Sequence, residues 1–130
     1  MTREASCCCG DLRIVVEGAP FINGICHCED CKKRTGSSFG WSAYFYDAKI
    51  IDTVGETLVY NVRGENPQQR HFCKTCGSTV FWKSSGFFAG MTGIAGACFA
   101  GSSLPDPDLT LSNENKCAWL TFPETWTQSL

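Results

Sequence analysis

The sequence predicts a mainly β protein made of short antiparallel strands. Apolar, β-branched and aromatic residues occur in short alternating runs, and turn-forming residues separate these runs. A single short segment has the composition of a helix. The chain also contains ten cysteines among its 130 residues. Such a density indicates metal ligands, disulfides or redox chemistry.

Four strands follow from these runs. They are rich in β-branched and aromatic residues and cover residues 12–16, 41–46, 57–62 and 79–82. Hairpin turns are expected where Gly, Asn, Pro or Ser cluster, at residues 54–56, 63–67 and 84–86. The backbone polar groups of such a chain would be paired across strands rather than within helices.

Two further segments differ from the strand pattern. Residues 29–37 look helical over one or two turns. Residues 84–105 carry no charge, but five of them are glycine, so their hydropathy is low and no membrane span is expected. We interpret this segment as a glycine-rich pair of strands or as a loop that faces a site.

A single domain is expected over residues 1–130, because no repeat, linker or low-complexity tract divides the chain. Hydrophobic residues make up 43% and charged residues 18%, which excludes a wholly disordered chain. The formal net charge of −2 lacks the basic excess of a dedicated nucleic-acid binder, so nucleic acid is not an expected partner.

The first residues contain no apolar stretch that could form the core of a signal peptide. We therefore expect a cytoplasmic protein whose thiols meet a reducing environment. In that environment, clustered cysteines serve as metal ligands or catalytic groups more often than as disulfides. Metal binding is thus the leading hypothesis for the cysteines.

Four cysteines have the spacing of a closed structural zinc site. Cys73 and Cys76 form a Cys-x-x-Cys-Gly turn, whose two sulfurs can converge on one ion. Cys7 and Cys9, one residue apart, would project from the same face of a strand and complete a tetrahedron. Cys8 would point to the opposite side and would not be a ligand. We call Cys7, Cys9, Cys73 and Cys76 the four-cysteine cluster.

Three other cysteines, Cys26, Cys28 and Cys31, form a second group within six residues. We call it the three-cysteine cluster. Catalytic zinc sites keep one coordination position open, whereas structural sites are closed by four protein ligands. We therefore expect this cluster to be the active centre.

An alternative is that a fourth residue closes the three-cysteine cluster and leaves a purely structural protein. Four residues are candidates for this role: His27, His71, Cys98 and Cys117. His27 is disfavoured, because a residue between two same-face cysteines of an extended segment points away from both. Cys98 and Cys117 are more simply explained as small buried apolar side chains.

Three motifs carry a family resemblance. They are Cys-x-Cys-Gly from Cys7, Cys-His-Cys-x-x-Cys-Lys-Lys-x-Thr-Gly-Ser from Cys26, and Arg-x-Phe-Cys-x-x-Cys-Gly-Ser from Arg70. In this order they resemble the glutathione-dependent formaldehyde-activating enzyme family, which also includes centromere protein V. The resemblance covers about residues 7–122. It implies an Mss4-like fold of stacked antiparallel sheets, stabilised by one zinc ion in each cysteine cluster.

The resemblance also implies an activity. Members of the family are described as adding glutathione to formaldehyde to give S-hydroxymethylglutathione, formally a carbon–sulfur lyase reaction in reverse. A metal-bound thiol ionises near neutral pH, which would activate the substrate sulfur. Lys32, Lys33 and Arg34 follow the third ligand and could pair with the carboxylates of a glutathione-like substrate.

Two other functions remain open at this point. One is a non-catalytic, zinc-stabilised binding module, as the centromere-protein relative suggests. The other is an enzyme resembling methionine sulfoxide reductase, which needs a free nucleophilic cysteine away from the zinc. Cys8 or Cys98 would have to serve in that role.

Overall fold

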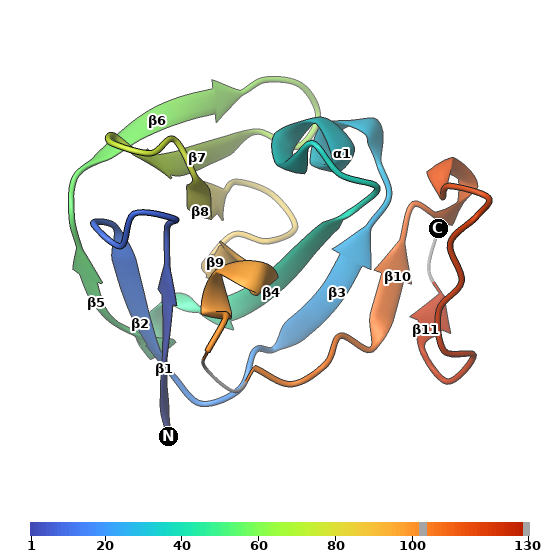
Figure 1. Ribbon diagram of the computed structural model, residues 1–130, viewed down its shortest axis with the longest axis horizontal. Helices are drawn as coiled ribbons and strands as arrows, with labels where there is room; N and C mark the ends of the chain where they lie inside the picture. Colours follow the sequence, from blue (N-terminus) through green and yellow to red (C-terminus); the bar gives the residue numbers. More distant parts are fainter. Residues whose placement is uncertain (102–103, 129–130) are drawn as a thin grey trace.

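The computed structural model describes residues 1–101 and 104–128 and contains two stacked β-sheets (Figure 1). The smaller sheet has three antiparallel strands in the order β1 (Thr2–Ser6), β2 (Arg13–Glu17) and β5 (Ile50–Val54). It lies beside the amino terminus, on the left of Figure 1.

The larger sheet has eight strands in the order β11-β10-β3-β4-β9-β8-β7-β6. Its strands have the bounds β3 Ile22–Cys26, β4 Gly40–Tyr46, β6 Thr57–Val62, β7 Gln68–Cys73, β8 Thr79–Ser84, β9 Met91–Ala95, β10 Leu109–Leu111 and β11 Thr127–Gln128. All neighbours are antiparallel except the pairs β3–β10 and β10–β11, which are parallel. The carboxy-terminal segment therefore extends the sheet beyond β3.

Helix α1 (Glu29–Thr35) connects β3 to β4 and lies above their adjoining ends (Figure 1). The Cys28 sulfur accepts a hydrogen bond from the Cys31 N–H at 3.3 Å, and this caps the helix. The helix ends at Gly36, which has a left-handed backbone conformation. Three 3-10 turns are also present, at Asp47–Lys49, Gly96–Phe99 and Asn113–Asn115.

The main hydrophobic core lies between the two sheets. Its buried residues come from both sheets and the adjoining turns: Ala5, Cys7, Leu12, Ile14, Val16, Ala43, Phe45, Cys73, Val80, Phe81, Ile94 and Phe99. Burying each large apolar side chain contributes about 1.5–3 kcal/mol. Cys7 and Cys73 belong both to this core and to the four-cysteine cluster, so that cluster is continuous with the core.

The mainly β, stacked-sheet prediction is confirmed. The four predicted strands correspond to β2, β4, β6 and β8, and the predicted helix corresponds to α1. The expected turns at residues 54–56, 63–67 and 84–86 follow β5, β6 and the end of β8. The single domain expected over residues 1–130 stays a prediction.

The uncharged segment between β8 and β10 contains one buried strand, β9, rather than a pair. Its glycine has a packing role, because a Cβ atom on Gly93 would lie 2.1 Å from the Trp82 Nε1. Any side chain at this position would collide with the Trp82 ring, so only glycine allows the ring to lie this close to β9. Among the described residues, no helix has the length and apolar character needed to span a membrane.

Candidate metal centres

The four-cysteine cluster joins two turns that are far apart in sequence. Cys7 and Cys9 lie in the turn between β1 and β2, whereas Cys73 ends β7 and Cys76 follows it. The Sγ atoms of Cys7 and Cys9 are 3.6 Å apart, and those of Cys9 and Cys73 are 3.7 Å apart. All four sulfurs lie within 4.8 Å of one another. Tetrahedral zinc with Zn–S bonds of about 2.3 Å requires sulfurs separated by roughly 3.8 Å, so the donor set fits zinc.

Hydrogen-bond donors surround the sulfurs of this cluster. The Leu12 N–H donates to the Cys7 sulfur at 3.2 Å, and the Thr75 N–H donates to the Cys73 sulfur at 3.3 Å. The Ser78 hydroxyl lies 3.3 Å from the Cys76 sulfur and is the main cause that lowers the pKa of Cys76 to about 5. Such donors favour the thiolate form that metal ions bind.

Gly77 has a φ of +79°, which turns the backbone sharply after Cys76. This left-handed conformation explains the glycine of the Cys-x-x-Cys-Gly motif. Cys8 is exposed, and its sulfur is not part of the convergent group, as expected from alternation along the chain. Its backbone N–H donates to the Ser78 hydroxyl at 3.3 Å instead.

The three-cysteine cluster lies where β3 passes into α1. Cys26 is the last residue of β3, Cys28 caps the helix, and Cys31 lies in its first turn. Their Sγ atoms lie within 4.8 Å of one another. The Ser112 hydroxyl lies 3.7 Å from the Cys26 sulfur. Ser112 follows β10 and has a φ of +55°, so the parallel pairing of β10 with β3 brings this hydroxyl to the cluster.

These thiols influence one another's ionisation because they lie close together. Hydrogen bonds with Cys28 and Cys31 lower the pKa of Cys26 to about 2, whereas hydrogen bonds with Cys26 and Cys28 raise the pKa of Cys31. Three thiolates at this separation repel one another, so all three can be ionised only when a cation lies between them. Three soft sulfur donors fit zinc, with one position left for a further ligand.

A pocket of about 290 Å³ opens beside the three-cysteine cluster. Its walls come from β3, β4, β10, the start of α1, the β6–β7 connection with the first residue of β7, and the last residue of β8 with the β8–β9 connection: Ile22, Gly24, Cys26, Cys28, Asp30, Cys31, Ser42, Tyr44, Asn66, Gln68, Ser84, Ser85, Phe87, Phe88 and Leu111. All three cysteines of the cluster line it. A small molecule in this pocket can therefore reach the sulfurs.

Among residues 1–101 and 104–128, no fourth Cys, His, Asp or Glu joins the three-cysteine cluster. The His71 Nδ1 lies 3.0 Å from the Thr57 hydroxyl, on the β6–β7 pair. Cys98 packs against the main core, and burial raises its pKa to about 11. Cys117 is half-buried and also lies outside the cluster. These three candidates for a fourth ligand are thus not brought to the cluster.

His27 is fully buried on the side away from the pocket. Its ring lies 6.0 Å from Phe39 and 5.4 Å from Phe122 between centroids, so it packs in an aromatic cluster. Within the described residues, neither ring nitrogen has a hydrogen-bond partner. Burial is the largest cause that lowers the pKa of His27, which keeps the ring neutral.

The structure places the three basic residues after Cys31 outside the pocket walls. The Lys32 ammonium donates to the Asn115 carbonyl at 2.5 Å, and Lys33 is exposed on the other side of α1, beside Arg70. The guanidinium of Arg34 lies 4.4 Å from the centroid of the Trp82 ring. Their expected role in substrate binding stays a prediction.

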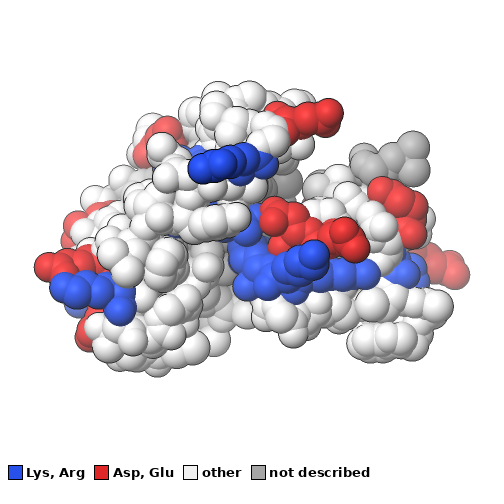
Figure 2. All heavy atoms as spheres, turned by 90° about the horizontal axis from the view of Figure 1, so that it is seen from above, with Lys and Arg blue, Asp and Glu red and all other residues white. Residues whose placement is uncertain are grey.

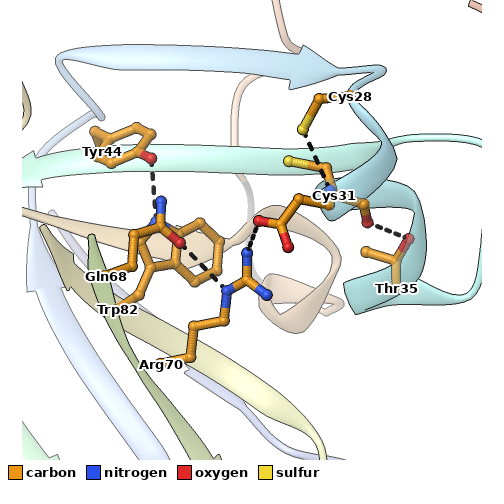
Figure 3. A network of polar contacts seen from close by, with 8 residues as sticks. Cys28, Cys31, Thr35, Tyr44, Gln68, Arg70 and Trp82 are labelled. Carbon is orange, nitrogen blue, oxygen red and sulfur yellow. Dashed lines mark hydrogen bonds and ion pairs between the residues drawn. The ribbon is translucent and has the colours of Figure 1, made fainter. Parts of the chain in front are cut away.

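Sequence reasoning missed two groups next to the cluster (Figure 3). The Tyr44 oxygen accepts a hydrogen bond from the Trp82 indole N–H at 3.1 Å, and burial raises the pKa of Tyr44. Arg70 donates to the carboxylate of Asp30 and, at 3.2 Å, to the side-chain oxygen of Gln68. Tyr44 and Trp82 lie in strands predicted from their aromatic and β-branched residues, a pattern that does not reveal a site, and no local signal connects Arg70 to Asp30.

Figure 2 shows a short row of Lys and Arg side chains across the middle of one face, with Asp and Glu side chains directly beside it. The adjoining acidic side chains distinguish this row from the purely basic stripe by which proteins follow a nucleic-acid backbone.

Comparison with known proteins identifies the family of this chain. Residues 2–114 match the family model described as glutathione-dependent formaldehyde-activating enzyme. One curated relative, from Halomonas elongata and named "Putative glutathione-dependent formaldehyde-activating enzyme", is 30% identical over 88 residues. That match covers 62% of this chain and 55% of the relative, so the chain spans about half the length of the relative. The chain belongs to the glutathione-dependent formaldehyde-activating enzyme family.

Proposed function

We propose that the protein adds a thiol to a small aldehyde, or cleaves the resulting adduct, in the pocket beside the three-cysteine cluster. The reaction is formally that of a carbon–sulfur lyase. Family membership supports the reaction type. The observation that carries the proposal is that three convergent cysteine sulfurs line a pocket, with no fourth protein ligand among the described residues.

The addition is balanced without an oxidant or reductant. A bond forms between the thiol sulfur and the aldehyde carbon, the carbon–oxygen double bond becomes single, and the thiol proton ends on the oxygen. A zinc ion held by Cys26, Cys28 and Cys31 would supply the Lewis acidity that lowers the pKa of the substrate thiol. The reverse reaction breaks the carbon–sulfur bond and returns the proton.

We assign to Tyr44 the task of binding the substrate oxygen. Its own oxygen already accepts the Trp82 indole N–H, so its hydroxyl proton remains available for the pocket that it lines. Burial raises the pKa of Tyr44, so the hydroxyl stays protonated at neutral pH. A fixed donor of this kind stabilises negative charge as it develops on the aldehyde oxygen.

A second zinc ion, in the four-cysteine cluster, would be structural. It would connect the β1–β2 turn of the small sheet to the turn after β7 of the large sheet. Because Cys7 and Cys73 are nearly fully buried in the core, this ion would stabilise the packing of the two sheets. The chain would then hold two zinc ions.

We further propose that glutathione is the natural thiol and that the protein acts in the cytoplasm. The description of the family as glutathione-dependent supports the choice of thiol. Ten free cysteines support a reducing compartment, since each one is available as a ligand or a reduced thiol. We also propose that Lys33, which is exposed on α1, contacts a carboxylate of glutathione outside the pocket.

A function resembling methionine sulfoxide reductase has less support. It requires a cysteine with a lowered pKa away from the zinc. Burial raises the pKa of Cys98 to about 11, which is the opposite of what a nucleophile needs. A non-catalytic binding module remains an outcome of the following experiment.

The test measures the exchange between free and adduct formaldehyde by NMR, with zinc-loaded protein, glutathione and formaldehyde. Wild type should raise the exchange rate above the uncatalysed one. The Cys31→Ser variant should lose this effect, whereas Cys8→Ser, a matched change at an exposed cysteine, should keep it. A wild-type rate equal to the uncatalysed rate would favour the binding module.

A further inference from the structure

The pocket beside the three-cysteine cluster has an aromatic wall opposite the sulfurs. The rings of Tyr44 and Phe88 are stacked, with centroids 4.2 Å apart and an angle of 12° between their planes. Ile22 and Phe88 pack against the buried cluster that contains Tyr44, and Leu111 also lines the pocket. Stacked rings hold each other in place, so this wall is a preformed apolar surface.

A second phenylalanine stands at the rim of the same pocket. Phe87 is 83% exposed and meets Phe88 edge to face, with ring centroids 5.0 Å apart. Two consecutive phenylalanines, in the connection between β8 and β9, thus line the pocket from its wall to its mouth. An exposed aromatic ring next to a pocket is available to cover an apolar ligand.

The size of the pocket exceeds what formaldehyde needs. Formaldehyde has only two non-hydrogen atoms, so it takes up roughly twice the 30 Å³ that one water molecule occupies in liquid water. The pocket has about 290 Å³. Formaldehyde would therefore leave most of the aromatic wall without a contact.

The charges around the pocket do not suit an anionic substrate group. Besides the cysteines, Asp30 is the one acidic or basic side chain among the described residues that line it. No Lys or Arg is among the described residues that line it. The Lys32 ammonium binds the Asn115 carbonyl, and Arg70 pairs with Asp30. The Arg34 guanidinium lies against the Trp82 ring, outside the walls, and Lys33 is exposed on α1. A carboxylate inside the pocket would therefore meet the Asp30 carboxylate with no cation in the walls.

From these observations we infer that the carbonyl substrate of this chain is an uncharged aldehyde with an aliphatic or aromatic group, rather than formaldehyde. The inference rests on the proposed thiol addition. The aldehyde carbon would face the three-cysteine cluster, its oxygen would meet the Tyr44 hydroxyl, and its apolar group would pack on Phe88 and Leu111. The bonds formed and broken are those of the proposed reaction, and the product is a hemithioacetal.

The experiment compares aldehydes with zinc-loaded protein and one thiol. Formaldehyde, acetaldehyde, butanal, benzaldehyde and glyoxylate are each assayed for kcat/KM, and each value is divided by the uncatalysed rate constant of the same aldehyde. A buried methylene contributes about a fourfold gain, so butanal should exceed formaldehyde by at least about tenfold. Glyoxylate, with its carboxylate, should be the poorest substrate.

Two variants test the aromatic wall. Phe88→Ala should lower the butanal-to-formaldehyde ratio of kcat/KM by about tenfold, and Phe88→Leu should restore most of it. The matched control is Phe21→Ala. Phe21 also contacts a tyrosine ring, that of Tyr46, with centroids 4.8 Å apart and planes tilted by 47°, but it lies outside the pocket and should not alter the ratio.

A binding measurement gives a readout that needs no turnover. Phenylmethanethiol should bind the zinc-loaded protein at least about tenfold more tightly than mercaptoacetate, because the first has an apolar ring and the second a carboxylate. Equal affinities, or a formaldehyde preference in the kinetic series, would overturn the apolar-aldehyde inference and leave the proposed function standing. Turnover of none of the aldehydes would overturn the proposed function and this inference together.

Discussion

Arg70 of β7 forms an ion pair with Asp30, which lies between Cys28 and Cys31 in the ligand segment of the three-cysteine cluster (Figure 3). The Arg70 side chain is 8% exposed and that of Asp30 is 56% exposed. Three residues after Arg70, the same strand ends at Cys73 of the four-cysteine cluster. One strand thus supports both candidate metal centres.

Replacing Asp30 by Asn should weaken metal binding at the three-cysteine cluster. The change leaves the nearly buried Arg70 without a counter-charge and loosens the segment that positions Cys28 and Cys31. Residues that orient ligands typically alter metal affinity by 10–100-fold, and we expect about tenfold here because Asp30 is half-exposed. Competition with a chromophoric chelator measures the affinity of each zinc ion. The four-cysteine site should be unaffected.

The Lys74–Glu56 pair is a matched control, since both side chains are largely exposed, at 61% and 77%. Glu56→Gln should alter the free energy of unfolding by less than about 0.5 kcal/mol and leave both zinc affinities unchanged. If Asp30→Asn behaved like Glu56→Gln, the Arg70–Asp30 pair would have no part in positioning the ligand segment.

Replacing a single ligand cysteine should remove one of the two zinc ions. Wild type is expected to bind two zinc ions, and both Cys26→Ser and Cys73→Ser should reduce this to one. Cys73→Ser should also destabilise the fold by several kcal/mol, because the residue is 1% exposed and belongs to the core. Elemental analysis and chemical denaturation measure the two effects. Cys8→Ser should match wild type in both, and a loss of zinc from that variant would contradict the ligand assignment.

Removing the Tyr44 hydroxyl should slow the proposed reaction more than it perturbs the fold. In Tyr44→Phe the substrate oxygen loses its donor, so kcat/KM should fall by about 10–100-fold. The buried Trp82 N–H loses its acceptor as well, which should cost about 1–2 kcal/mol of stability. Kinetics and thermal unfolding separate the two effects. Tyr46→Phe, on the same strand but outside the pocket, is the control and should keep wild-type kinetics.

The Asp47 carboxylate should make stability dependent on pH in the acidic range. Burial alone would raise its pKa, but hydrogen bonds from Lys83 at 2.5 Å and Thr92 at 2.8 Å hold the pKa below the ordinary 3.8. A lowered folded-state pKa stabilises the protein above about pH 4, and this contribution is lost as the pH falls through the folded value. Both partners of the ion pair are about 40% exposed or more, so the contribution is only about 0.5 kcal/mol.

The measurement is the difference in unfolding free energy between wild type and Asp47→Asn, which cancels effects common to both proteins. It should be largest near neutral pH and should approach zero below about pH 3. A difference that grows as the pH falls would mean that the Asp47 pKa is raised rather than lowered.

Short-range patterns in the sequence predicted much of the fold. Strands such as β4 and β6 contain β-branched and aromatic residues in alternation, and the spacing of the cysteines identified both groups of convergent sulfurs. In contrast, β7 reads Gln-Gln-Arg-His-Phe-Cys and lacks an apolar alternation. It lies between β6 and β8, and its polar side chains have polar partners: Arg70 pairs with Asp30, and His71 lies beside the Thr57 hydroxyl. Its pairing partners, rather than its own propensity, determine its conformation.

The pocket could not be predicted from local patterns, because long-range pairing brings its walls together. Ser112 reaches Cys26 only because β10 pairs with β3 in parallel, and 86 residues separate the two in sequence. The pairing of Arg34 with a substrate carboxylate stays a prediction, and its contact with the Trp82 ring was not foreseen. The orientation of the seven-residue helix depends on its contacts with β4, which sequence spacing does not reveal.

The most direct test of the central claim is the number of sulfur ligands per zinc ion, measured by X-ray absorption at the zinc edge, with and without an added thiol. An open three-cysteine site beside a closed four-cysteine site predicts an average below four sulfurs per zinc, rising to four when the thiol saturates the pocket. An average of four without thiol, or one that does not change on addition, would contradict an open site that binds the substrate sulfur.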